Sequence, residues 1–203
     1  MKNDVCGVGL AYGSKVAGVR ILSGPITDVD EAAALNYGFH DVSIYSCSWG
    51  PPDDGKSMDA PGYIIQKAVV NGIQNGRGGR GSVFVFASGN GAFYGDQCNF
   101  DGYTNSIYSV TVAAVDYKGL HPYYSESCAA NMIVAYSSGS GKSIVGIVTQ
   151  QPHPWFIGVS RLLLTLGRID AQLPMEGHQL LPRMLLAYFP LLSQYGVSPS
   201  ILL

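Results

Sequence analysis

The 203-residue chain has few charged residues, no excess of basic side chains and no long apolar run. Only 13% of its residues are charged and 47% are hydrophobic, against about 25% charge in an ordinary soluble domain, which excludes disorder driven by charge. The net charge of −2 offers no basic field for a phosphate backbone, so we expect no nucleic-acid partner. No run approaches the ~18 apolar residues that span a bilayer, and no signal-peptide pattern is recognisable, so we expect no membrane segment in this chain.

The chain also lacks the cysteine spacing of a zinc site. Its four cysteines are too far apart and too irregularly placed for a Cys-x₂-Cys pair. Their number alone leaves secretory disulfides open. Cys47 lies in a run typical of a buried strand, and we expect it to be a free thiol in the core.

The composition changes abruptly near Val145. Residues 1–145 contain 21 of the 26 glycines and four leucines, whereas residues 146–203 contain thirteen leucines, six of the eleven prolines and five charged residues. The prolines of the second segment interrupt every helix period, and it shows neither caps nor a strand–turn–strand pattern. We therefore divide the chain into a domain at 1–145 and a leucine- and proline-rich tail at 146–203, for which irregular structure is expected.

Patterns typical of strands and helices alternate along residues 1–145. The predicted strands are Lys15–Leu22, Val42–Trp49, Ser82–Ala87, Ser106–Ala114 and Asn131–Tyr136. Thr27 is expected to cap a helix that ends at Gly38, and Pro61 to begin a second helix that ends at Gly76. This alternation predicts an α/β domain with a mostly parallel sheet and helices on both faces. Functional residues of such sheets lie beyond the carboxyl ends of the strands.

Polar residues follow two of these predicted strands. Asn90 comes shortly after Ala87, where its carboxamide is placed to donate an N–H to a developing oxyanion, although Asn-Gly is also a common turn dipeptide. Asp53 and Asp54 follow Trp49, and two adjacent carboxylates repel each other unless a cation or a basic ligand neutralises them. The alternative for this pair is a solvated acidic turn.

Further carboxylates flank two cysteines. Asp96 and Asp101 lie on either side of Cys98, and Glu126 lies just before Cys128. A bridge between the two cysteines would gather these acids, and oxygen ligands from several segments suit Ca²⁺, which takes about 6–8 of them. The alternative is that the acids are unconnected polar residues in loops.

Two glycine-rich stretches are similar to nucleotide-binding motifs, but neither fits its context. In Gly7–Gly13 the third glycine of a dinucleotide loop comes one residue late, and Gly139–Ser143 lacks the first glycine and the following helix of a P-loop. We therefore expect no nucleotide partner. None of the four histidines has the partners expected of a catalytic base.

Together, five segments resemble the kexin and furin branch of the subtilisin-like serine proteases, and the fungal kexins in particular. The segments are Asn3–Gly9, Tyr45–Pro51, Asp53–Lys56, Phe86–Gly91 and Cys98–Tyr108. The resemblance covers residues 3–145 almost without gaps. It implies a truncated subtilisin-like α/β fold and a Ca²⁺-dependent serine endopeptidase that processes secretory precursors after paired basic residues. The parent protein would act in the secretory pathway, at the late Golgi membrane, while the location of this chain itself stays open.

The resemblance also implies roles for individual residues. Asn90 matches the oxyanion-hole residue, and Ser48 and Gly50 match the wall of the pocket for the substrate's P1 side chain. The other matched sets are Asp53 and Asp101 for a P1 arginine; Glu31 and Asp59, with Asp28 close by, for a basic P4 residue; Asp53, Asp96 and Glu126 for one Ca²⁺; Asn3, Val5 and Gly7 for part of a second Ca²⁺ site; and Cys98 with Cys128 for a disulfide. Pairs of carboxylate oxygens suit a guanidinium group, which supports the specificity for basic side chains.

The resemblance assigns no residue of this chain to the catalytic triad. The family's catalytic Asp and His lie before Met1, the motif with the nucleophilic Ser is absent after Val145, and Cys6 lacks its family partner. We therefore expect no proteolysis by this chain alone. The alternative function is a catalytically dead binder of basic peptides that keeps the matched carboxylates.

The tail at 146–203 offers an explanation for the missing motif. When residues 174–186 are back-translated and the frame is moved by one base, the codons permit the family sequence around the nucleophile. Our hypothesis is that the residues after about Val145 derive from intron and out-of-frame reading. Sequencing the transcript tests this, because an in-frame message that encodes the tail contradicts it.

Overall fold

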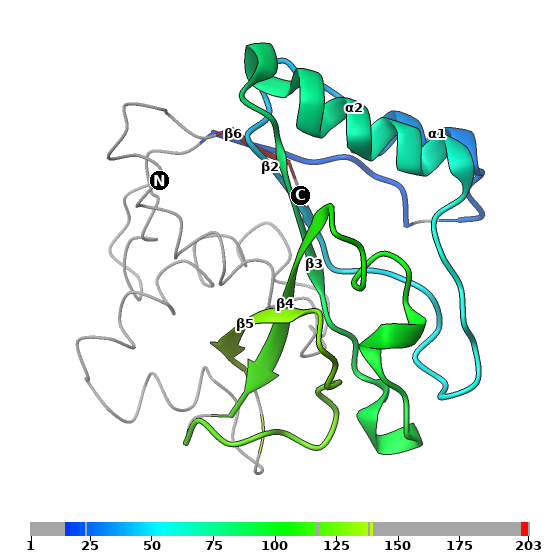
Figure 1. The fold of residues 1–203 in the computed structure, drawn as a ribbon, viewed down its shortest axis with the longest axis vertical. Coiled ribbons are helices and arrows are strands. Elements are labelled where there is room, and N and C mark those ends of the chain that lie inside the picture. The colour runs from blue at the N-terminus through cyan, green and yellow to red at the C-terminus, as the bar shows by residue number, and fades with distance from the viewer. Residues whose placement is uncertain (1–14, 23, 117, 138, 140–199, 203) are drawn as a thin grey trace.

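A six-stranded sheet organises the chain, with strand order β1-β6-β2-β3-β4-β5 (Figure 1). The computed structural model describes residues 15–22, 24–116, 118–137, 139 and 200–202. Its elements are β1 (Lys15–Ala17), α1 (Asp28–Leu35), β2 (Ile44–Cys47), α2 (Tyr63–Gly79), β3 (Val83–Ala87), the 3₁₀ helices η1 (Gly91–Tyr94) and η2 (Cys98–Phe100), β4 (Ser109–Val115), β5 (Asn131–Tyr136) and β6 (Ser200–Leu202). All pairings between these strands are parallel, which confirms the predicted α/β class.

Within the described residues, helices cover one face of the sheet. From β1 to β5 the chain advances across the sheet in one direction, so right-handed crossovers place α1 and α2 on the same side, where they contact each other (Figure 1). The helices expected on the opposite face are not among the described residues. All four residues of β2 are nevertheless buried, and because neighbouring side chains point to opposite faces, both faces of the sheet are covered at this strand.

Aromatic side chains dominate the core between the helices and the sheet. The ring of Tyr45 on β2 stacks on that of Phe84 on β3 with centroids 4.7 Å apart, and Trp49 meets Phe86 edge-on at 5.7 Å. Gly72 lets α2 approach β3, because a Cβ at this position would lie 2.7 Å from the ring of Phe84. The core therefore depends on close contact between one helix and the two central strands.

The first helix, α1, begins at the predicted cap. The Thr27 side chain accepts a hydrogen bond from the Asp30 N–H, and the Asp30 carboxylate accepts one from the Thr27 N–H at 3.0 Å, which completes a capping box. The helix ends at Leu35, earlier than expected. The predicted terminator Gly38 lies in the following turn with φ 64°.

The second helix, α2, begins at Tyr63 rather than at Pro61, with Gly62 as its N-cap. Its regular part ends before Gly76, as predicted, because Gly76, Arg77 and Gly78 have non-helical backbone angles. This glycine-rich turn leads the chain directly into β3.

Two of the predicted strands were too long, and the tail was not wholly irregular. β1 keeps only the first three residues of the predicted Lys15–Leu22, and β2 ends at Cys47 rather than at Trp49. Most of the tail lies outside the described residues, but Ser200–Leu202 forms β6, a strand where irregular structure was expected. No local periodicity signals this strand, because its partners β1 and β2 are far away in sequence.

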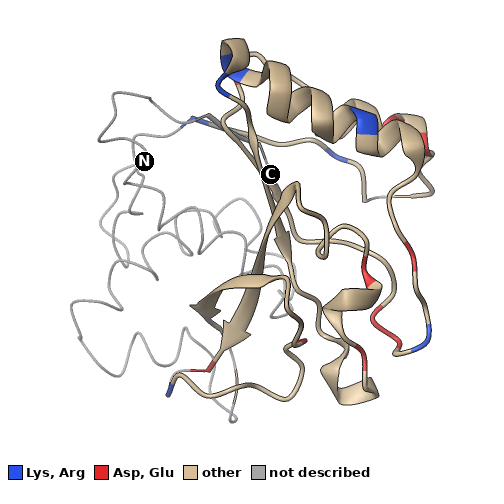
Figure 2. Cartoon of the chain, viewed as in Figure 1, with Lys and Arg blue, Asp and Glu red and all other residues tan. Residues whose placement is uncertain are grey.

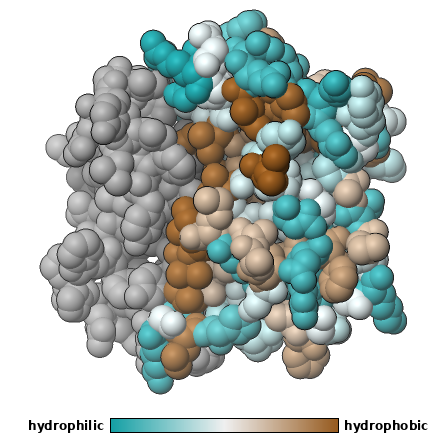
Figure 3. Space-filling view, viewed as in Figure 1, coloured by the Kyte–Doolittle hydropathy of each residue, from teal (hydrophilic) through white to brown (hydrophobic). Residues whose placement is uncertain are grey.

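The surface separates apolar and acidic regions. β5 lies at one edge of the sheet, where Met132 is 69% and Val134 is 54% exposed, and Figure 3 shows a hydrophobic band over this strand. Acidic residues lie instead on the loops that follow the strands and in the first turn of α1 (Figure 2). No helix among the described residues is long and apolar enough to cross a membrane.

Candidate functional site

The loops after β2, β3 and β4 bring four carboxylates together. Asp53 follows β2, whereas Asp96 and Asp101 lie between β3 and β4, and Glu126 lies between β4 and β5. One oxygen each of Asp53, Asp96 and Glu126 lies within 4.8 Å of the other two. Asp101 is close enough to this group to interact electrostatically with it. Asp53, Asp96, Asp101 and Glu126 thus form one group, which we call the acidic cluster.

Backbone N–H groups hold three members of the acidic cluster in place. The donors come from loops other than that of the acceptor, so each bond also ties two loops together. The bonds run from Asn90 N to Asp53 (2.7 Å), from Gly55 N to Asp96 (3.0 Å) and from Gly91 N to Glu126 (2.8 Å). Hydrogen bonds to a carboxylate favour its charged form and so offset part of the repulsion between these acids.

Two glycines allow Glu126 to approach the loop after β3. A Cβ on Gly89 would clash with the Glu126 carboxylate, and one on Gly91 would lie 3.0 Å from it. Gly89 also has φ +105°, a backbone conformation that other residues rarely adopt. The Ser-Gly-Asn-Gly sequence therefore forms a turn and also makes room for a buried carboxylate.

Burial raises the pKa of two carboxyls in the cluster. Desolvation is the main cause for Glu126, whose pKa rises from 4.5 to about 8; the hydrogen bond from the Gly91 N–H acts in the opposite direction, and the charges of its three acidic neighbours raise the pKa further. Desolvation also raises the pKa of Asp101 from 3.8 to about 6, while hydrogen bonds from the N–H groups of Tyr103 and Thr104 act in the opposite direction. A cation bound here would lower both pKa values by favouring the charged forms.

The donor set of the cluster fits calcium. Ca²⁺ binds hard oxygen ligands, and three carboxylates from different loops, two of them buried, lie close enough to share one ion. Without a counter-ion, poorly solvated like charges at this separation repel each other. Asp53, Asp96 and Glu126 are therefore the residues that would hold the ion. The residues implied for a second calcium site, Asn3, Val5 and Gly7, lie outside the described residues.

Asn90 lies beside the acidic cluster at the carboxyl end of β3. Its backbone N–H bonds to Asp53, which fixes the loop. Its side-chain oxygen is buried and has no hydrogen-bond partner within the described part of the chain. The side-chain oxygen of Asn90 therefore does not stabilise the loop. A buried acceptor of this kind is expected where a ligand or a neighbouring segment binds.

The residues implied for the P1 pocket wall lie next to one of the implied P1 carboxylates. Ser48 and Gly50 follow β2, with Ser48 half-buried and Gly50 exposed. A Cβ on Gly50 would lie 3.0 Å from a carboxylate oxygen of Asp101. The structure thus brings the loop after β2 into close contact with Asp101, where a larger residue than glycine would require the Asp101 side chain to move.

A second acidic group forms near the start of α1. The Tyr103 hydroxyl donates to the Glu31 carboxylate at 2.7 Å, and Glu31 is buried. Desolvation raises the pKa of Glu31; the hydrogen bond from Tyr103 lowers it, and the charges of Asp28 and Asp59 raise it. A Cβ on Gly62 would clash with Asp28, so this carboxylate lies against the start of α2. Glu31, Asp28 and Asp59 are therefore neighbours, although Asp28 and Asp59 remain exposed.

Tyr103 connects the two acidic groups, and sequence analysis did not identify it. Its backbone N–H donates to Asp101 at 2.7 Å, while its hydroxyl reaches Glu31. A parallel bridge between Asp59 and Asp101 supports the same connection, with Gly102 N–H donating to the Asp59 carbonyl at 2.8 Å. Because Tyr103 and Glu31 are 72 positions apart, no local pattern indicates their contact.

The disulfide implied by the resemblance is present, between Cys98 and Cys128 with their Cα atoms 5.4 Å apart. It ties η2 to the loop that carries Glu126. The Asn131 side chain donates to the Glu126 carbonyl at 3.0 Å and holds the other side of this loop. Cys47 is a free and buried thiol, as expected, and burial raises its pKa.

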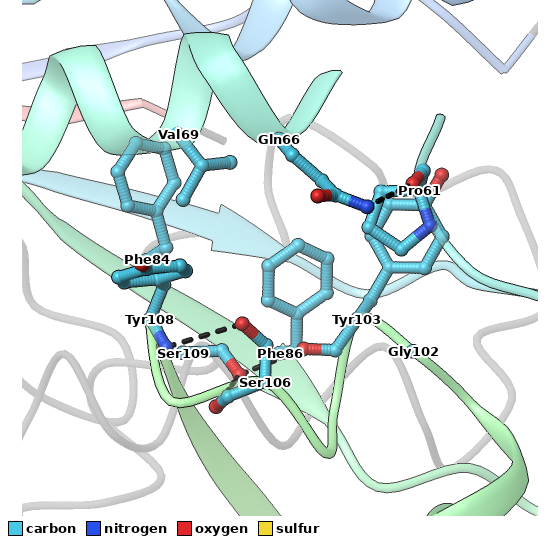
Figure 4. Close-up of a pocket in the computed structure, with 10 residues that line it drawn as sticks. All are labelled: Pro61, Gln66, Val69, Phe84, Phe86, Gly102, Tyr103, Ser106, Tyr108 and Ser109. Carbon is cyan, nitrogen blue, oxygen red and sulfur yellow. Dashed lines mark hydrogen bonds between the residues drawn. The ribbon is translucent and has the colours of Figure 1, made fainter. Parts of the chain in front are cut away.

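A small apolar pocket lies between α2, β3 and the chain segment 102–109 (Figure 4). The rings of Phe84, Phe86 and Tyr103 line it, and the Gln66 amide donates to the Pro61 carbonyl at 2.8 Å on one side. No carboxylate lines this pocket. We therefore assign it to the packing of Tyr103 rather than to the recognition of a cation.

Comparisons with known proteins agree with the motifs. The model of the subtilase family matches residues 1–159. The kexin of Candida albicans is 63% identical over 144 residues, which are 71% of this chain and 15% of that protein. The kexin of Saccharomyces cerevisiae is 58% identical over 142 residues (70% and 17%), and human proprotein convertase subtilisin/kexin type 7 is 52% identical over 147 residues (72% and 19%). The chain spans 15% to 19% of the length of these three relatives.

Proposed function

Because this chain belongs to the subtilase family, we propose that it is part of a calcium-dependent serine endopeptidase that cleaves secretory precursors after paired basic residues. The observation that carries the proposal is the convergence of Asp53, Asp96, Asp101 and Glu126 from three separate loops. Such a concentration of negative charge favours a cationic substrate and a metal ion over neutral or anionic ligands.

In this proposal two acidic groups recognise two basic side chains. Asp53 and Asp101 receive the guanidinium group of the residue before the cleaved bond, with Ser48 and Gly50 forming the adjacent wall. Glu31, Asp59 and Asp28 receive a second basic residue further along the peptide. The contact from Tyr103 to both groups supports a fixed spacing between these two subsites.

Asn90 would stabilise the oxyanion of an acyl-transfer reaction through its carboxamide N–H. Its place at the carboxyl end of β3, beside Asp53, supports this role because the substrate carbonyl would then lie next to the pocket for the basic side chain. The calcium ion would neutralise Asp53, Asp96 and Glu126 and so fix the loops that carry both the pocket and Asn90.

We further propose that the parent protein acts in the secretory pathway, at the late Golgi membrane, and that this chain alone does not hydrolyse peptides. The resemblance assigns no residue of the chain to the nucleophile or the base, and these groups supply most of the rate of a serine protease. Binding of basic peptides without hydrolysis is the alternative function, and it would use the same carboxylates.

Calorimetric titration of the full chain with a peptide that contains Arg-Arg tests the proposal. We expect binding that needs Ca²⁺ and is lost in Asp101→Asn. Asp41→Asn, which removes an exposed acid before β2 and away from the acidic cluster, is the matched control and should bind normally. Equal affinity for an Arg-Arg peptide and a Gln-Gln peptide would contradict the proposed specificity. Release of peptide fragments by the chain would contradict its inactivity.

A further inference from the structure

Three exposed aromatic side chains lie together on the loops that carry the acidic cluster. Phe93 and Tyr94 belong to η1, whereas Tyr123 lies between β4 and β5, and the three side chains are 73%, 69% and 72% exposed. The ring of Phe93 meets that of Tyr94 edge-on with centroids 5.5 Å apart, and that of Tyr123 at 6.5 Å. We call these three rings the aromatic patch. Exposed apolar groups that gather in this way mark a binding surface, whereas single exposed rings do not.

The backbone under the aromatic patch is held by hydrogen bonds. The Ala92 N–H donates to the Tyr124 carbonyl at 3.2 Å and so joins η1 to the loop of Tyr123. The Tyr124 hydroxyl donates to the buried Ser137 hydroxyl at 2.8 Å, which anchors this loop in the interior. At the end of η1, the Gly95 N–H donates to the Ala92 carbonyl at 3.0 Å. A ligand that binds the rings therefore does not need to order these loops.

The acidic cluster shares its loops with the aromatic patch. Asp96 follows Tyr94 by two residues, and Glu126 follows Tyr123 by three. A Cβ on Gly55 would clash with the Tyr94 carbonyl, so the loop after β2 also contacts this segment. With one Ca²⁺ bound, the four carboxylates of the cluster still carry an excess of two negative charges. The faces of aromatic rings are negative as well, so both features favour a cationic ligand.

Another exposed ring of this chain already has a cation. The Lys67 ammonium lies 5.3 Å from the centre of the Tyr63 ring, whose side chain is 75% exposed. Within the part of the chain that the structure describes, no lysine or arginine lies over a ring of the aromatic patch. The patch therefore offers ring faces that no cation of the described residues uses.

We propose that the aromatic patch is a recognition surface for cationic side chains, and that it binds an arginine-rich segment of the same polypeptide whose basic residue enters the acidic cluster. The guanidinium groups stack on the ring faces, and the neighbouring carboxylates attract them at longer range. Arginine fits better than lysine because its planar group stacks on an aromatic ring. The inference rests on the proposed function for the natural ligand, and it extends that function to basic residues outside the Arg-Arg pair.

Hydroxyl-radical footprinting of the unmodified full chain at saturating Ca²⁺ tests the proposal. The probe is a peptide of five arginines, and the matched control is a peptide of five citrullines, which have nearly the shape of arginine but no charge. Oxidation of Phe93, Tyr94 and Tyr123 should fall at least threefold with the arginine peptide and stay unchanged with the citrulline peptide. Tyr37, which is 64% exposed, and Tyr63 should react equally throughout. Unchanged oxidation of the patch, or equal protection by both peptides, would overturn the proposal.

A substitution measures the contribution of a single ring. Tyr123→Ala should weaken binding of the five-arginine peptide about threefold in a calorimetric titration, which is the effect of one exposed cation–π contact. Tyr37→Ala, which removes an exposed ring outside the patch, is the matched control and should bind normally. Equal affinity of the two variants would overturn the proposal. Thermal unfolding of both variants reports whether they remain folded.

The titration with the Arg-Arg peptide separates this inference from the proposed function. If that peptide binds but the rings stay unprotected by the five-arginine peptide, the aromatic patch alone is refuted. If the rings are protected but the Arg-Arg peptide does not bind, the proposed function fails while recognition of cations by the patch stands. Oxidation of the rings that falls with rising protein concentration, in the absence of any peptide, would identify a second copy as the occupant and would overturn the proposal.

Discussion

Tyr45 and Phe84 in the core and Asp96 and Glu126 in the acidic cluster are all buried, yet their burial has opposite effects on folding. Burial of each aromatic side chain lowers the free energy of the folded state. Each carboxylate loses hydration and meets its like-charged neighbours, so its burial opposes folding until a cation or a hydrogen bond compensates. The core therefore supplies the stability that keeps the acidic cluster together, as the proposed role of the cluster in ligand binding requires.

The largest effect is expected where the core is weakened. Phe84→Ala should lower the free energy of unfolding by about 3–5 kcal/mol, because it leaves a cavity between Tyr45 and the close approach at Gly72. Phe93→Ala, at a position that is 73% exposed, should change it by less than about 0.5 kcal/mol. Urea unfolding followed by circular dichroism measures both. Equal losses in the two variants would contradict the assignment of the core.

Calcium should act next most strongly, and among the described residues it should act through the acidic cluster. At a hundredfold excess over its dissociation constant, an ion that binds only the folded state stabilises it by about 2.7 kcal/mol. Thermal unfolding with Ca²⁺ and with EGTA measures this shift. Glu126→Gln should abolish most of the calcium effect, because it removes a ligand carboxylate, without lowering stability in EGTA, because Gln resembles the protonated Glu126 favoured below a pKa of about 8. An equal calcium effect in Glu126→Gln would show that the ion binds elsewhere.

The pH dependence should also distinguish the two regions. The folded chain raises the pKa of Glu126 from 4.5 to about 8 and that of Asp101 from 3.8 to about 6. Between these values the folded state holds protons that the unfolded state has released, so in EGTA the stability should fall as the pH rises from 4.5 to 8. Urea midpoints at pH 5, 6.5 and 8 measure the trend, and Glu126→Gln should flatten it. Stability that rises over this range would contradict the raised pKa values of these buried carboxyls.

The smallest effect is expected at a helix end remote from the acidic cluster. Thr27→Ala removes the capping box of α1 and should cost roughly 1 kcal/mol of stability. Thr27→Ser keeps the hydroxyl and serves as the control. Peptide binding at saturating Ca²⁺ should change little in either variant, because the cap's hydrogen bonds are to Asp30, which belongs to neither acidic group. A loss of binding in Thr27→Ala alone would mean that α1 positions Glu31 more directly than we infer.

Local sequence patterns predicted the elements whose partners are near in the chain. The cap at Thr27, the end of regular helix at Gly76 and the strand Asn131–Tyr136 all follow from a few adjacent residues. The gathering of the acids was also foreseeable, because parallel strands end at a common edge. The contact of Tyr103 with Glu31 and the insertion of β6 were not, since they depend on packing between distant segments.

The disulfide between Cys98 and Cys128 makes the geometry of the acidic cluster depend on the redox conditions around the chain. Cys98 and Cys128 connect the segment before Asp101 to the segment after Glu126, so one covalent link restrains a carboxylate implied for arginine and another implied for calcium. A reducing milieu opens this link and frees both segments together. If the two groups of carboxylates bind as we propose, reduction should therefore weaken cation binding and peptide binding together.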